Sequence, residues 1–280
     1  MKNVLRTLIY NGQVSLTLAD TTALVREGIR LHRMTPASAC VFGKALSAMT
    51  FMSACLKEAT GEISLSIKGN GGEIAVSGNS RLYMRGFIED TAMECAVTNA
   101  ERVYFGDTSS LTVIRDDGYN RPFVGACATP DDAGVDEAFE EYFRISEQLP
   151  TRIKTLVEMN ETECVFAGIV AVQPLPFAAE SVLQQVAELS LEDILAEVQK
   201  QGVTSAAETR FGRDNTVWEE REAKYQCNCS REYLTRVLVS LGETQMRSII
   251  KEDGAVRVHC HYCNTDYEFT EQDADLLFKK

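Results

Sequence analysis

Four cysteines near the C-terminal end constrain the fold of this chain more than any other feature. They form two close pairs, Cys227-Asn-Cys229 and Cys260-His-Tyr-Cys263, with 30 residues between the pairs. Two close pairs around a loop of this size are the spacing of a four-thiolate zinc site. The first pair has a single intervening residue, which also puts its two thiols within reach of each other. The same cysteines could therefore hold a metal when reduced and form two local disulfides when oxidised.

The bulk composition indicates a globular protein without affinity for nucleic acid or membranes. The formal net charge of the 280 residues is −13, whereas binding to phosphates or to anionic lipid needs clustered Lys and Arg. We find no apolar segment long enough for a transmembrane helix and no secretory signal at the N-terminus. Nine cysteines without an export signal predict a protein of the reducing cytoplasm. Five of them are isolated and are expected to be small buried side chains: Cys40, Cys55, Cys95, Cys127 and Cys164.

An α+β fold is predicted for residues 1 to about 178, with an antiparallel sheet and packed helices. Ile63-Ser-Leu-Ser-Ile67 alternates strictly between apolar and polar residues, as a half-buried strand does. Glycine-rich turns follow it and predict a three-stranded meander. Thr35-Pro36 is typical of a helix start, and the small residues that follow would let this helix approach a sheet closely. The predicted helices are 20–34, 36–57 and 136–148, and the predicted strands are 63–67, 73–76, 82–88, 102–105, 111–115, 153–159 and 164–172.

Residues 179–224 differ from the core and are predicted to form a helical linker. Its apolar residues recur at helical spacing: Leu183, Val186, Leu189, Ile194, Leu195 and Val198. The segment is acidic, with ten Asp and Glu against five Lys and Arg. Short isolated helices are marginal in water, so these helices must bury their apolar stripe on neighbours to persist. A metastable linker and an ordinary helical connector are both consistent with the sequence.

Residues 225–280 form a small cysteine module. Helices are predicted over 230–241, ended by Gly242, and over 243–250. Asp253-Gly254 predicts a hairpin turn before a strand at 256–260, and Tyr267-Glu-Phe269 predicts a second strand. A module of 56 residues has little apolar core, and a structural metal is the usual remedy.

The four cysteines leave two interpretations of the site open. If all four bind one zinc ion, no coordination position remains for water or substrate, so the site is not a hydrolytic centre. His259 and His261 could compete as ligands, although four sulfurs are already available. The metal is either purely structural or part of a redox sensor, since zinc-bound sulfur is thiolate and thiolate reacts with oxidants. Metal binding adds about 10 kcal/mol to the folding of such modules, so losing it should unfold this one.

Several motifs together resemble one known family. Those in the module are Cys227-Asn-Cys-Ser-Arg231, Leu241-Gly-Glu, Ile249-Ile-Lys-Glu-Asp-Gly254 and Cys260-His-Tyr-Cys263. Those in the core are Tyr142 with Ser146-Glu-Gln-Leu-Pro-Thr151, Gln173-Pro-Leu-Pro176, Arg85-Gly86 and the segment from Gly118 to Gly125. In these residues the chain resembles the 33-kilodalton heat-shock protein family of redox-regulated holdase chaperones. The resemblance spans essentially the whole chain and is weakest over 179–224, where the acidic run 204–222 departs from the family's pattern.

The resemblance implies a switch between two states. In the reduced state the four cysteines bind one Zn²⁺ per chain, and the protein is inactive as a chaperone. Peroxide with mild unfolding, or hypochlorite, forms the Cys227–Cys229 and Cys260–Cys263 disulfides and releases the zinc. The module and the linker then lose structure and expose a surface that holds unfolding client proteins. The family uses no ATP, is not an enzyme, and is commonly a homodimer when active.

Our leading hypothesis is therefore a cytoplasmic, ATP-independent chaperone that oxidation switches on. A first rival is a zinc-ribbon adaptor or nucleic-acid-binding protein with a purely structural zinc. Residues 225–280 hold seven Lys and Arg against nine Asp and Glu, which is a poor composition for phosphate contacts. A second rival is a metalloenzyme or thiol oxidoreductase. Only three histidines are present, and four cysteines can saturate the metal, so hydrolytic chemistry has little support.

Overall fold

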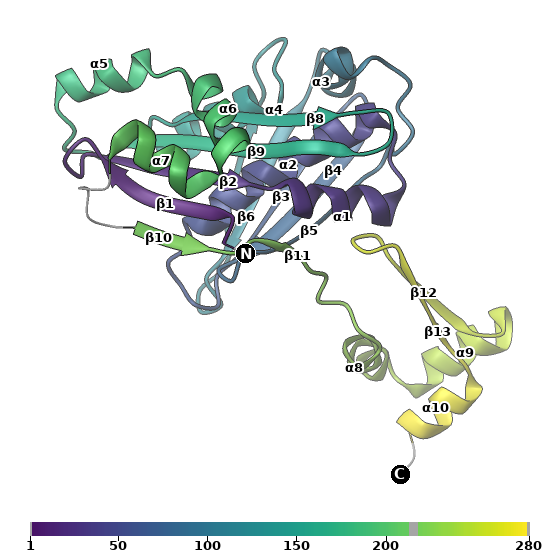
Figure 1. The fold of residues 1–280 in the computed structure, drawn as a ribbon. Coiled ribbons are helices and arrows are strands. Elements are labelled where there is room, and N and C mark those ends of the chain that lie inside the picture. Colours follow the sequence, from purple (N-terminus) through teal and green to yellow (C-terminus); the bar gives the residue numbers. More distant parts are fainter. Residues whose placement is uncertain (1, 213–217, 279–280) are drawn as a thin grey trace. The chain divides into compact units, whose positions relative to one another are not determined.

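Two β-sheets with a helix between them form the core of the first unit in the computed structural model of this chain (Figure 1). The structure describes residues 2–212 and 218–278, so residues 213–217 of the predicted linker lie outside the description, as do residues 1, 279 and 280. The chain divides into two compact units, Met1–Gln226 and Cys227–Lys280. The predicted division into a core of residues 1–178, a linker of 179–224 and a module of 225–280 stays a prediction.

The first sheet has five antiparallel strands, and the second has six, of which β11 pairs with β5 in parallel. The order β10-β1-β2-β9-β8 gives the first sheet the strands Trp218–Arg221, Val4–Ile9, Val14–Asp20, Cys164–Pro174 and Arg152–Met159. The order β11-β5-β4-β3-β6-β7 gives the second sheet Lys224–Tyr225, Tyr83–Ile88, Gly72–Asn79, Glu62–Gly69, Ser110–Asp116 and Phe123–Ala128. The predicted meander is confirmed as β3-β4-β5, whereas the sequence did not predict β1, β2 and β7.

The helix α2, Pro36–Ala54, lies between the two sheets and is buried on nearly every side. It contacts β8 and β9 of one sheet and β4 and β5 of the other, so its apolar residues form no single stripe. Thr35 caps its start as predicted, because its side-chain oxygen accepts a hydrogen bond from the first turn. Small residues permit this packing: a Cβ on Gly43 would lie 2.8 Å from Val25 and 3.0 Å from Val157.

Two more predicted helices of the core are confirmed. Helix α1, Thr22–His32, packs against α2 and β9. Helix α4, Val135–Tyr142, packs against β8 and continues as a π-helical turn, Phe143–Glu147. The fold is α+β, as predicted. Among the helices that the structure describes, none combines the length and the apolarity needed to cross a membrane.

The predicted strand 102–105 is wrong, because this segment belongs to the helix α3, Ala100–Phe105. The apolar residues of this segment are consistent with a strand, but its contacts with residues distant in sequence favour a helix. The Tyr104 hydroxyl is fully buried and lies 3.0 Å from the carbonyl oxygen of Ile67 and 2.9 Å from that of Gly72. The turn between β3 and β4 therefore positions the helix, and no local pattern in the sequence reports that contact.

The predicted linker begins with three helices that pack on the five-stranded sheet. They are α5, Glu180–Glu188, α6, Leu191–Gln201, and α7, Val203–Phe211. Figure 1 shows α6 and α7 lying along β9, β2 and β1. The segment then continues through β10, which pairs with β1, and β11, which pairs with β5.

The second unit combines short helices with a two-stranded sheet. Its described elements are α8, Arg231–Leu241, α9, Glu243–Asp253, β12, Val256–Cys260, β13, Thr265–Phe269, and α10, Glu271–Leu277. Its described apolar cluster contains Leu238, Met246, Ile250, Val256, Phe269 and Ala274. The hairpin turn predicted at Asp253-Gly254 is wrong: Asp253 is the last residue of α9, and Gly254 ends the helix with a φ of +80°.

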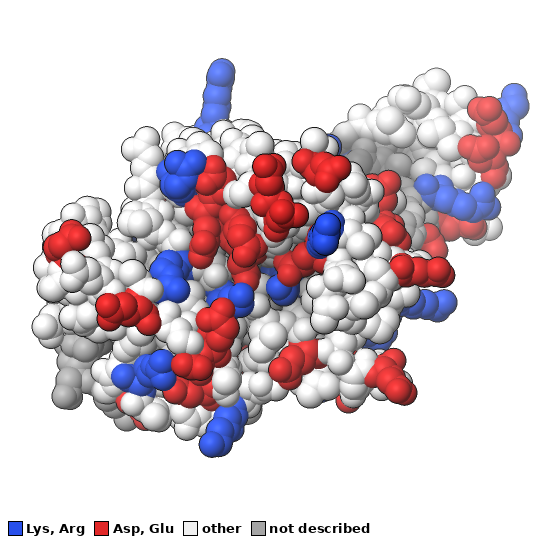
Figure 2. All heavy atoms as spheres, turned by 90° about the horizontal axis from the view of Figure 1, so that it is seen from above, with Lys and Arg blue, Asp and Glu red and all other residues white. Residues whose placement is uncertain are grey.

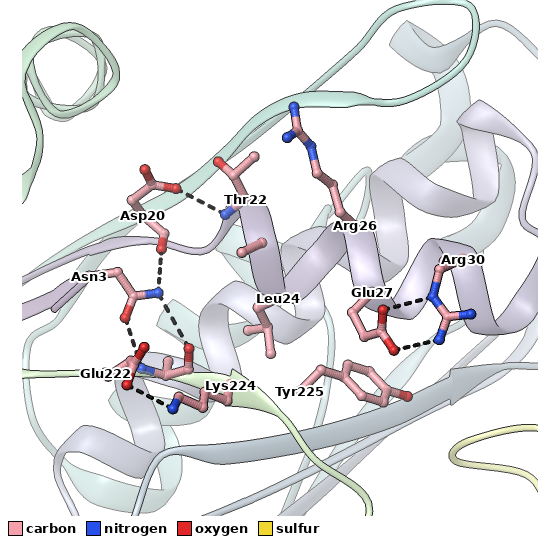
Figure 3. Close-up of a pocket in the computed structure, with 12 residues that line it drawn as sticks. Asn3, Asp20, Thr22, Leu24, Arg26, Glu27, Arg30, Glu222, Lys224 and Tyr225 are labelled. Atoms are coloured by element: carbon pink, nitrogen blue, oxygen red, sulfur yellow. Dashed lines mark hydrogen bonds and ion pairs between the residues drawn. The ribbon is translucent and has the colours of Figure 1, made fainter. Parts of the chain in front are cut away.

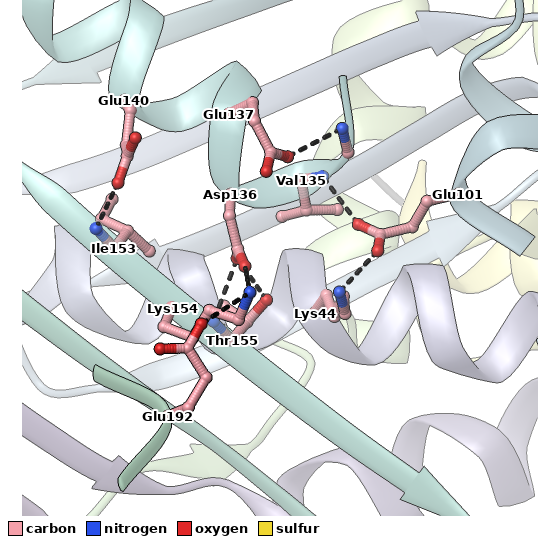
Figure 4. A network of polar contacts seen from close by, with 11 residues as sticks. Lys44, Glu101, Val135, Asp136, Glu137, Glu140, Ile153, Lys154, Thr155 and Glu192 are labelled. Atoms are coloured by element: carbon pink, nitrogen blue, oxygen red, sulfur yellow. Dashed lines mark hydrogen bonds and ion pairs between the residues drawn. The ribbon is translucent and has the colours of Figure 1, made fainter. Parts of the chain in front are cut away.

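A network of charged side chains joins α4 to its neighbours (Figure 4). Asp136, in the first turn of α4, accepts hydrogen bonds from the Thr155 amide at 3.0 Å and the Thr155 hydroxyl at 2.5 Å. The Lys154 ammonium lies 3.8 Å from the second oxygen of the same carboxylate. On the other side of the helix start, Lys44 of α2 pairs with Glu101 at 2.5 Å. Charged side chains from α2, α3, α4 and β8 therefore lie close together around the start of α4. Their burial there costs stability unless they are paired.

Replacing Asp136 by Asn tests the cost of this burial. Burial raises the pKa of the Asp136 carboxyl from 3.8 to about 6, and the Lys44 ammonium opposes that shift. The folded protein thus binds this proton more tightly than the unfolded chain does, so the carboxyl's contribution to stability is lost as the pH rises through about 6. We expect the urea midpoint of the wild type to fall relative to that of Asp136→Asn between about pH 4 and pH 7. Asp193→Asn, on an exposed position, serves as the control, and an opposite trend would contradict the prediction.

Candidate metal centre and a covered apolar face

The four predicted cysteines converge in the second unit. Cys227 and Cys229 precede α8, Cys260 ends β12, and Cys263 lies in the turn between β12 and β13. Their four Sγ atoms all lie within 4.8 Å of one another. The Sγ atoms of Cys227 and Cys260 are 3.6 Å apart, and those of Cys229 and Cys263 are 3.1 Å apart. Each of these contacts joins one close sequence pair to the other, and all four thiols are free.

Two local structures present the thiols. In the β12–β13 turn, the Cys260 carbonyl accepts hydrogen bonds from the amides of Cys263, at 3.3 Å, and Asn264, at 2.8 Å. Asn264 adopts a left-handed φ of 55°, which reverses the chain tightly after the second pair. In the first pair, the Cys229 amide lies 3.5 Å from Cys227 Sγ, an orientation that suits a negatively charged sulfur.

The cluster suits a soft cation. Four thiolates around one Zn²⁺ at about 2.3 Å place their sulfurs roughly 3.8 Å apart, close to the spacing found here. Burial raises the pKa of the Cys227 thiol, the hydrogen bond from the Cys229 amide opposes that shift, and the thiols of Cys229 and Cys260 add to it. A cation must therefore displace protons to bind, and its affinity falls as the pH is lowered. The residues present fit a four-sulfur metal site.

Two hydroxyl groups beside the thiols were not predicted. The Tyr267 hydroxyl lies 3.3 Å from Cys229 Sγ, and the Thr265 hydroxyl lies 3.3 Å from Cys263 Sγ. Both residues belong to β13 and are two apart, so they share one face of the strand. The alternation of side chains along the strand could have indicated that the two hydroxyls share a face. It places them beside the cysteines only once the pairing of β12 with β13 is known.

The remaining histidines and cysteines stand apart from the cluster. Within the described residues, the converging ligand atoms include neither His259 nor His261. Instead His259 Nδ1 lies 2.7 Å from an Asp266 oxygen. Three of the five isolated cysteines are buried as expected, Cys40, Cys127 and Cys164, while Cys55 and Cys95 are half-buried. Burial raises the pKa of both Cys40 and Cys164 to about 11, which makes these thiols unreactive at neutral pH.

The chain that leads to the first cysteine is attached to the core of the first unit. Asn3 bridges the strands here, because its side chain accepts a hydrogen bond from the Ala223 amide at 2.8 Å and donates to the Asp20 carbonyl at 2.9 Å. The Tyr225 hydroxyl donates to the Gly86 carbonyl at 2.8 Å. Figure 3 shows Asn3, Asp20 and Tyr225 around a pocket between α1 and the segment 222–225. The Gln226 amide also donates to the Met84 carbonyl at 2.8 Å, so the chain is anchored up to the residue before Cys227.

The helices α5, α6 and α7 cover an apolar face of the five-stranded sheet. The sheet contributes Leu5, Ile9, Val14, Leu16, Leu18, Phe166, Val170 and Val172, and the helices contribute Val182, Val186, Leu191, Ile194, Leu195, Val198, Val203, Ala206 and Ala207. Of the predicted apolar stripe, Val186, Ile194, Leu195 and Val198 are buried in this face, Leu189 is partly buried against it, and Leu183 is half-buried outside it. Without the helices the sheet would present a contiguous apolar face, of the kind that binds other chains.

Comparison with known proteins places the chain in a family. The family model described as Hsp33 protein matches residues 2–270. This chain belongs to the Hsp33 family. Among its relatives, the 33 kDa chaperonin of Bacillus mycoides (strain KBAB4) is 33% identical and is covered over 100% of both chains. The 33 kDa chaperonin of Clostridium botulinum (strain Eklund 17B / Type B) is 31% identical over 99% of this chain and 97% of its own.

A solved structure shares the fold of this Hsp33-family chain. The crystal structure of the 33 kDa chaperonin (heat shock protein 33 homolog) from Thermotoga maritima matches with a TM-score of 0.83. The match covers 99% of this chain and 98% of that protein, at 24% sequence identity. At this identity the likeness shows the fold.

Replacing Tyr267 by Phe tests the role of its hydroxyl beside the thiols. Loss of a group that orients a metal ligand typically lowers metal affinity by about 10–100-fold. We therefore expect Tyr267→Phe to bind Zn²⁺ more weakly by an amount in that range. Competition with a chromophoric chelator on the reduced protein measures the change. Tyr233→Phe, on the exposed side of α8, is the matched control. An affinity equal to that of the wild type would show that the hydroxyl does not act on the site.

Proposed function

We propose that this Hsp33-family chain is an ATP-independent holdase chaperone that oxidation switches on. The observation that carries the proposal is the convergence of two close cysteine pairs into one cluster of four free thiols. The family supports a chaperone, since the relatives are named chaperonins, which are not enzymes. The apolar sheet face beneath α5–α7 supplies a surface on which unfolded chains could bind.

In the reduced state, Cys227, Cys229, Cys260 and Cys263 are the ligands of one Zn²⁺ per chain. Four sulfurs fill a tetrahedral site, so the bound ion supplies folding energy and offers no open position for catalysis. The second unit needs that energy because the apolar cluster among its described residues is small. Metal binding on the order of 10 kcal/mol would dominate the stability of such a unit.

Oxidation removes the ligands in pairs. One hydrogen peroxide accepts two electrons from a close pair of thiols, forms one disulfide and leaves as two water molecules. Two peroxides thus convert Cys227–Cys229 and Cys260–Cys263 to disulfides and free the cation. The second unit loses its main source of stability, and the segment 179–226 loses the folded unit that follows it. Release of α5–α7 then exposes the sheet face, which holds clients through apolar contacts that require neither a defined sequence nor ATP.

The direct test combines zinc release with client protection. Reduced, zinc-loaded protein is treated with peroxide at raised temperature, and released zinc, remaining thiols and suppression of client aggregation are measured together. We expect four thiols to disappear, one zinc ion to leave per chain, and holdase activity to appear in the same samples. Cys95→Ser, which changes a half-buried cysteine outside the cluster, should behave as the wild type does. Zinc release without any holdase activity would refute the proposal.

Replacing Cys227 by Ser should separate regulation from activity. The variant lacks one zinc ligand, so the second unit should be less folded even under reducing conditions. We expect weaker zinc binding and holdase activity that no longer needs an oxidant, measured by aggregation of a thermally unfolded client in the presence of a reductant. A Cys227→Ser protein that still requires peroxide would contradict the proposed role of the cluster.

The rival with a purely structural zinc, a nucleic-acid adaptor, has less support. Figure 2 shows acidic side chains gathered across one face of the molecule with basic side chains scattered among them, and the net charge is −13. Such a surface repels phosphates. We also propose a cytoplasmic location. We further propose a homodimeric active form, which sedimentation of the reduced and oxidised protein would test.

A further inference from the structure

Arg152 of β8 holds the end of helix α5. One nitrogen of its guanidinium lies 3.1 Å from the Ala187 carbonyl oxygen and 3.0 Å from that of Leu189, and it also contacts the Val186 carbonyl. These carbonyls belong to the C-terminal end of the helix, where backbone oxygens lack partners within the helix and carry a partial negative charge. No glycine ends α5, and Leu189 follows in an extended conformation. The Leu189 amide donates to the Val186 carbonyl at 3.3 Å, and a side chain of the core supplies the rest of the cap.

Lys154, two residues along β8, holds the beginning of helix α6. Its ammonium lies 3.3 Å from Glu192, in the first turn of α6, and 3.8 Å from the buried carboxylate of Asp136 (Figure 4). Glu192 itself is largely exposed, so this pair alone would be worth little. Lys154 nevertheless lies between two carboxylates, one on the core and one on the linker, and it connects them.

The two cations act at one junction. They are two residues apart on β8 and so lie on the same face of the strand, and together they contact both sides of the α5–α6 turn. We propose that Arg152 and Lys154 form a clasp that positions the α5–α6 turn on the core and sets how readily the covering helices leave the sheet. The apolar contacts beneath the helices are non-directional, whereas these bonds require one placement of the chain.

The clasp matters most for α5, which has the weakest apolar attachment. It buries two residues, Val182 and Val186, whereas α6 buries four, Leu191, Ile194, Leu195 and Val198. The capped end of α5 is therefore where loss of charged contacts should first free the cover. This inference rests on the proposed function only where it concerns chaperone activation. The attachment itself is a property of the reduced chain.

Hydrogen exchange of the reduced, zinc-loaded protein tests the clasp. Arg152→Gln breaks the cap of α5, and Glu192→Gln breaks the link to α6 while leaving Lys154 beside Asp136. The controls are Arg144→Gln, whose ion pair with Glu141 stays within the α4 region, and Asp193→Asn, which removes an exposed charge from the same turn of α6. Peptides from 180–201 report on the helices, and peptides from β3 and β4 report on the core.

We expect the amides of 180–201 to exchange about tenfold faster in Arg152→Gln than in the wild type. In Glu192→Gln the acceleration should be smaller, and in both variants the exchange of β3 and β4 should be unchanged. Exchange in the wild type should also speed up with added salt, and this salt effect should shrink in both variants. In Arg152→Lys, the amides of 180–201 should exchange at a rate between those of the wild type and Arg152→Gln. Lysine keeps the positive charge but lacks the planar guanidinium group.

Three results would overturn the clasp: unchanged exchange over 180–201, equal acceleration in β3 and β4, or the same acceleration in the two controls. The failure of the proposed function looks different. A wild-type protein that never protects a client refutes the chaperone proposal, but its exchange pattern still decides the clasp. If both proposals hold, Arg152→Gln should need less peroxide or a lower temperature than Arg144→Gln to reach half-maximal holdase activity.

Discussion

The five-stranded sheet is apolar on both faces, and the rest of the first unit depends on how those faces are covered. One face packs on α2, which the six-stranded sheet covers in turn, so the two sheets share a continuous core. The other face is closed by three helices of 9, 11 and 9 residues. Helices this short are marginal in isolation, so they persist only while they are docked. One sheet thus has a permanent cover and a conditional one.

The conditional cover and the cysteine cluster are consecutive in the chain. The segment after α7 is held by β10 and β11, and the second unit begins at Cys227. That unit has a small apolar core and a cluster of thiols that suits a cation. In the proposed function, thiol chemistry acts on the unit with the smaller apolar cluster. In the proposed function, this order along the chain is the reason why a change of oxidation state at the cysteines alters the stability of the segment that precedes them.

Charged groups are concentrated near the beginning of the conditional cover. Asp136, Lys154 and Glu192 meet where α4, β8 and α6 approach one another, and Arg152 lies beside them on β8. Only Asp136 of this group is buried and carries the full desolvation cost, whereas Glu192 is largely exposed, and the hydrogen bonds of the group impose one geometry. At this position they favour a defined placement of the linker over the strongest possible attachment. An all-apolar junction would hold the helices more firmly and would release them less readily.

The sequence by itself determined the elements whose signals are local. The close cysteine pairs, the cap at Thr35, the alternating strand at 63–67 and the apolar stripe of the linker all followed from spacing alone. Only the tertiary structure decided which surfaces meet. Three features depend on contacts between residues that are 30 or more positions apart. They are the helix at 100–105, the Tyr267 hydroxyl beside Cys229, and the hydrogen bonds of Arg152 to the end of α5. Periodicity in a sequence shows that a face is apolar, but the partner of that face is chosen by long-range packing, which the local pattern does not encode.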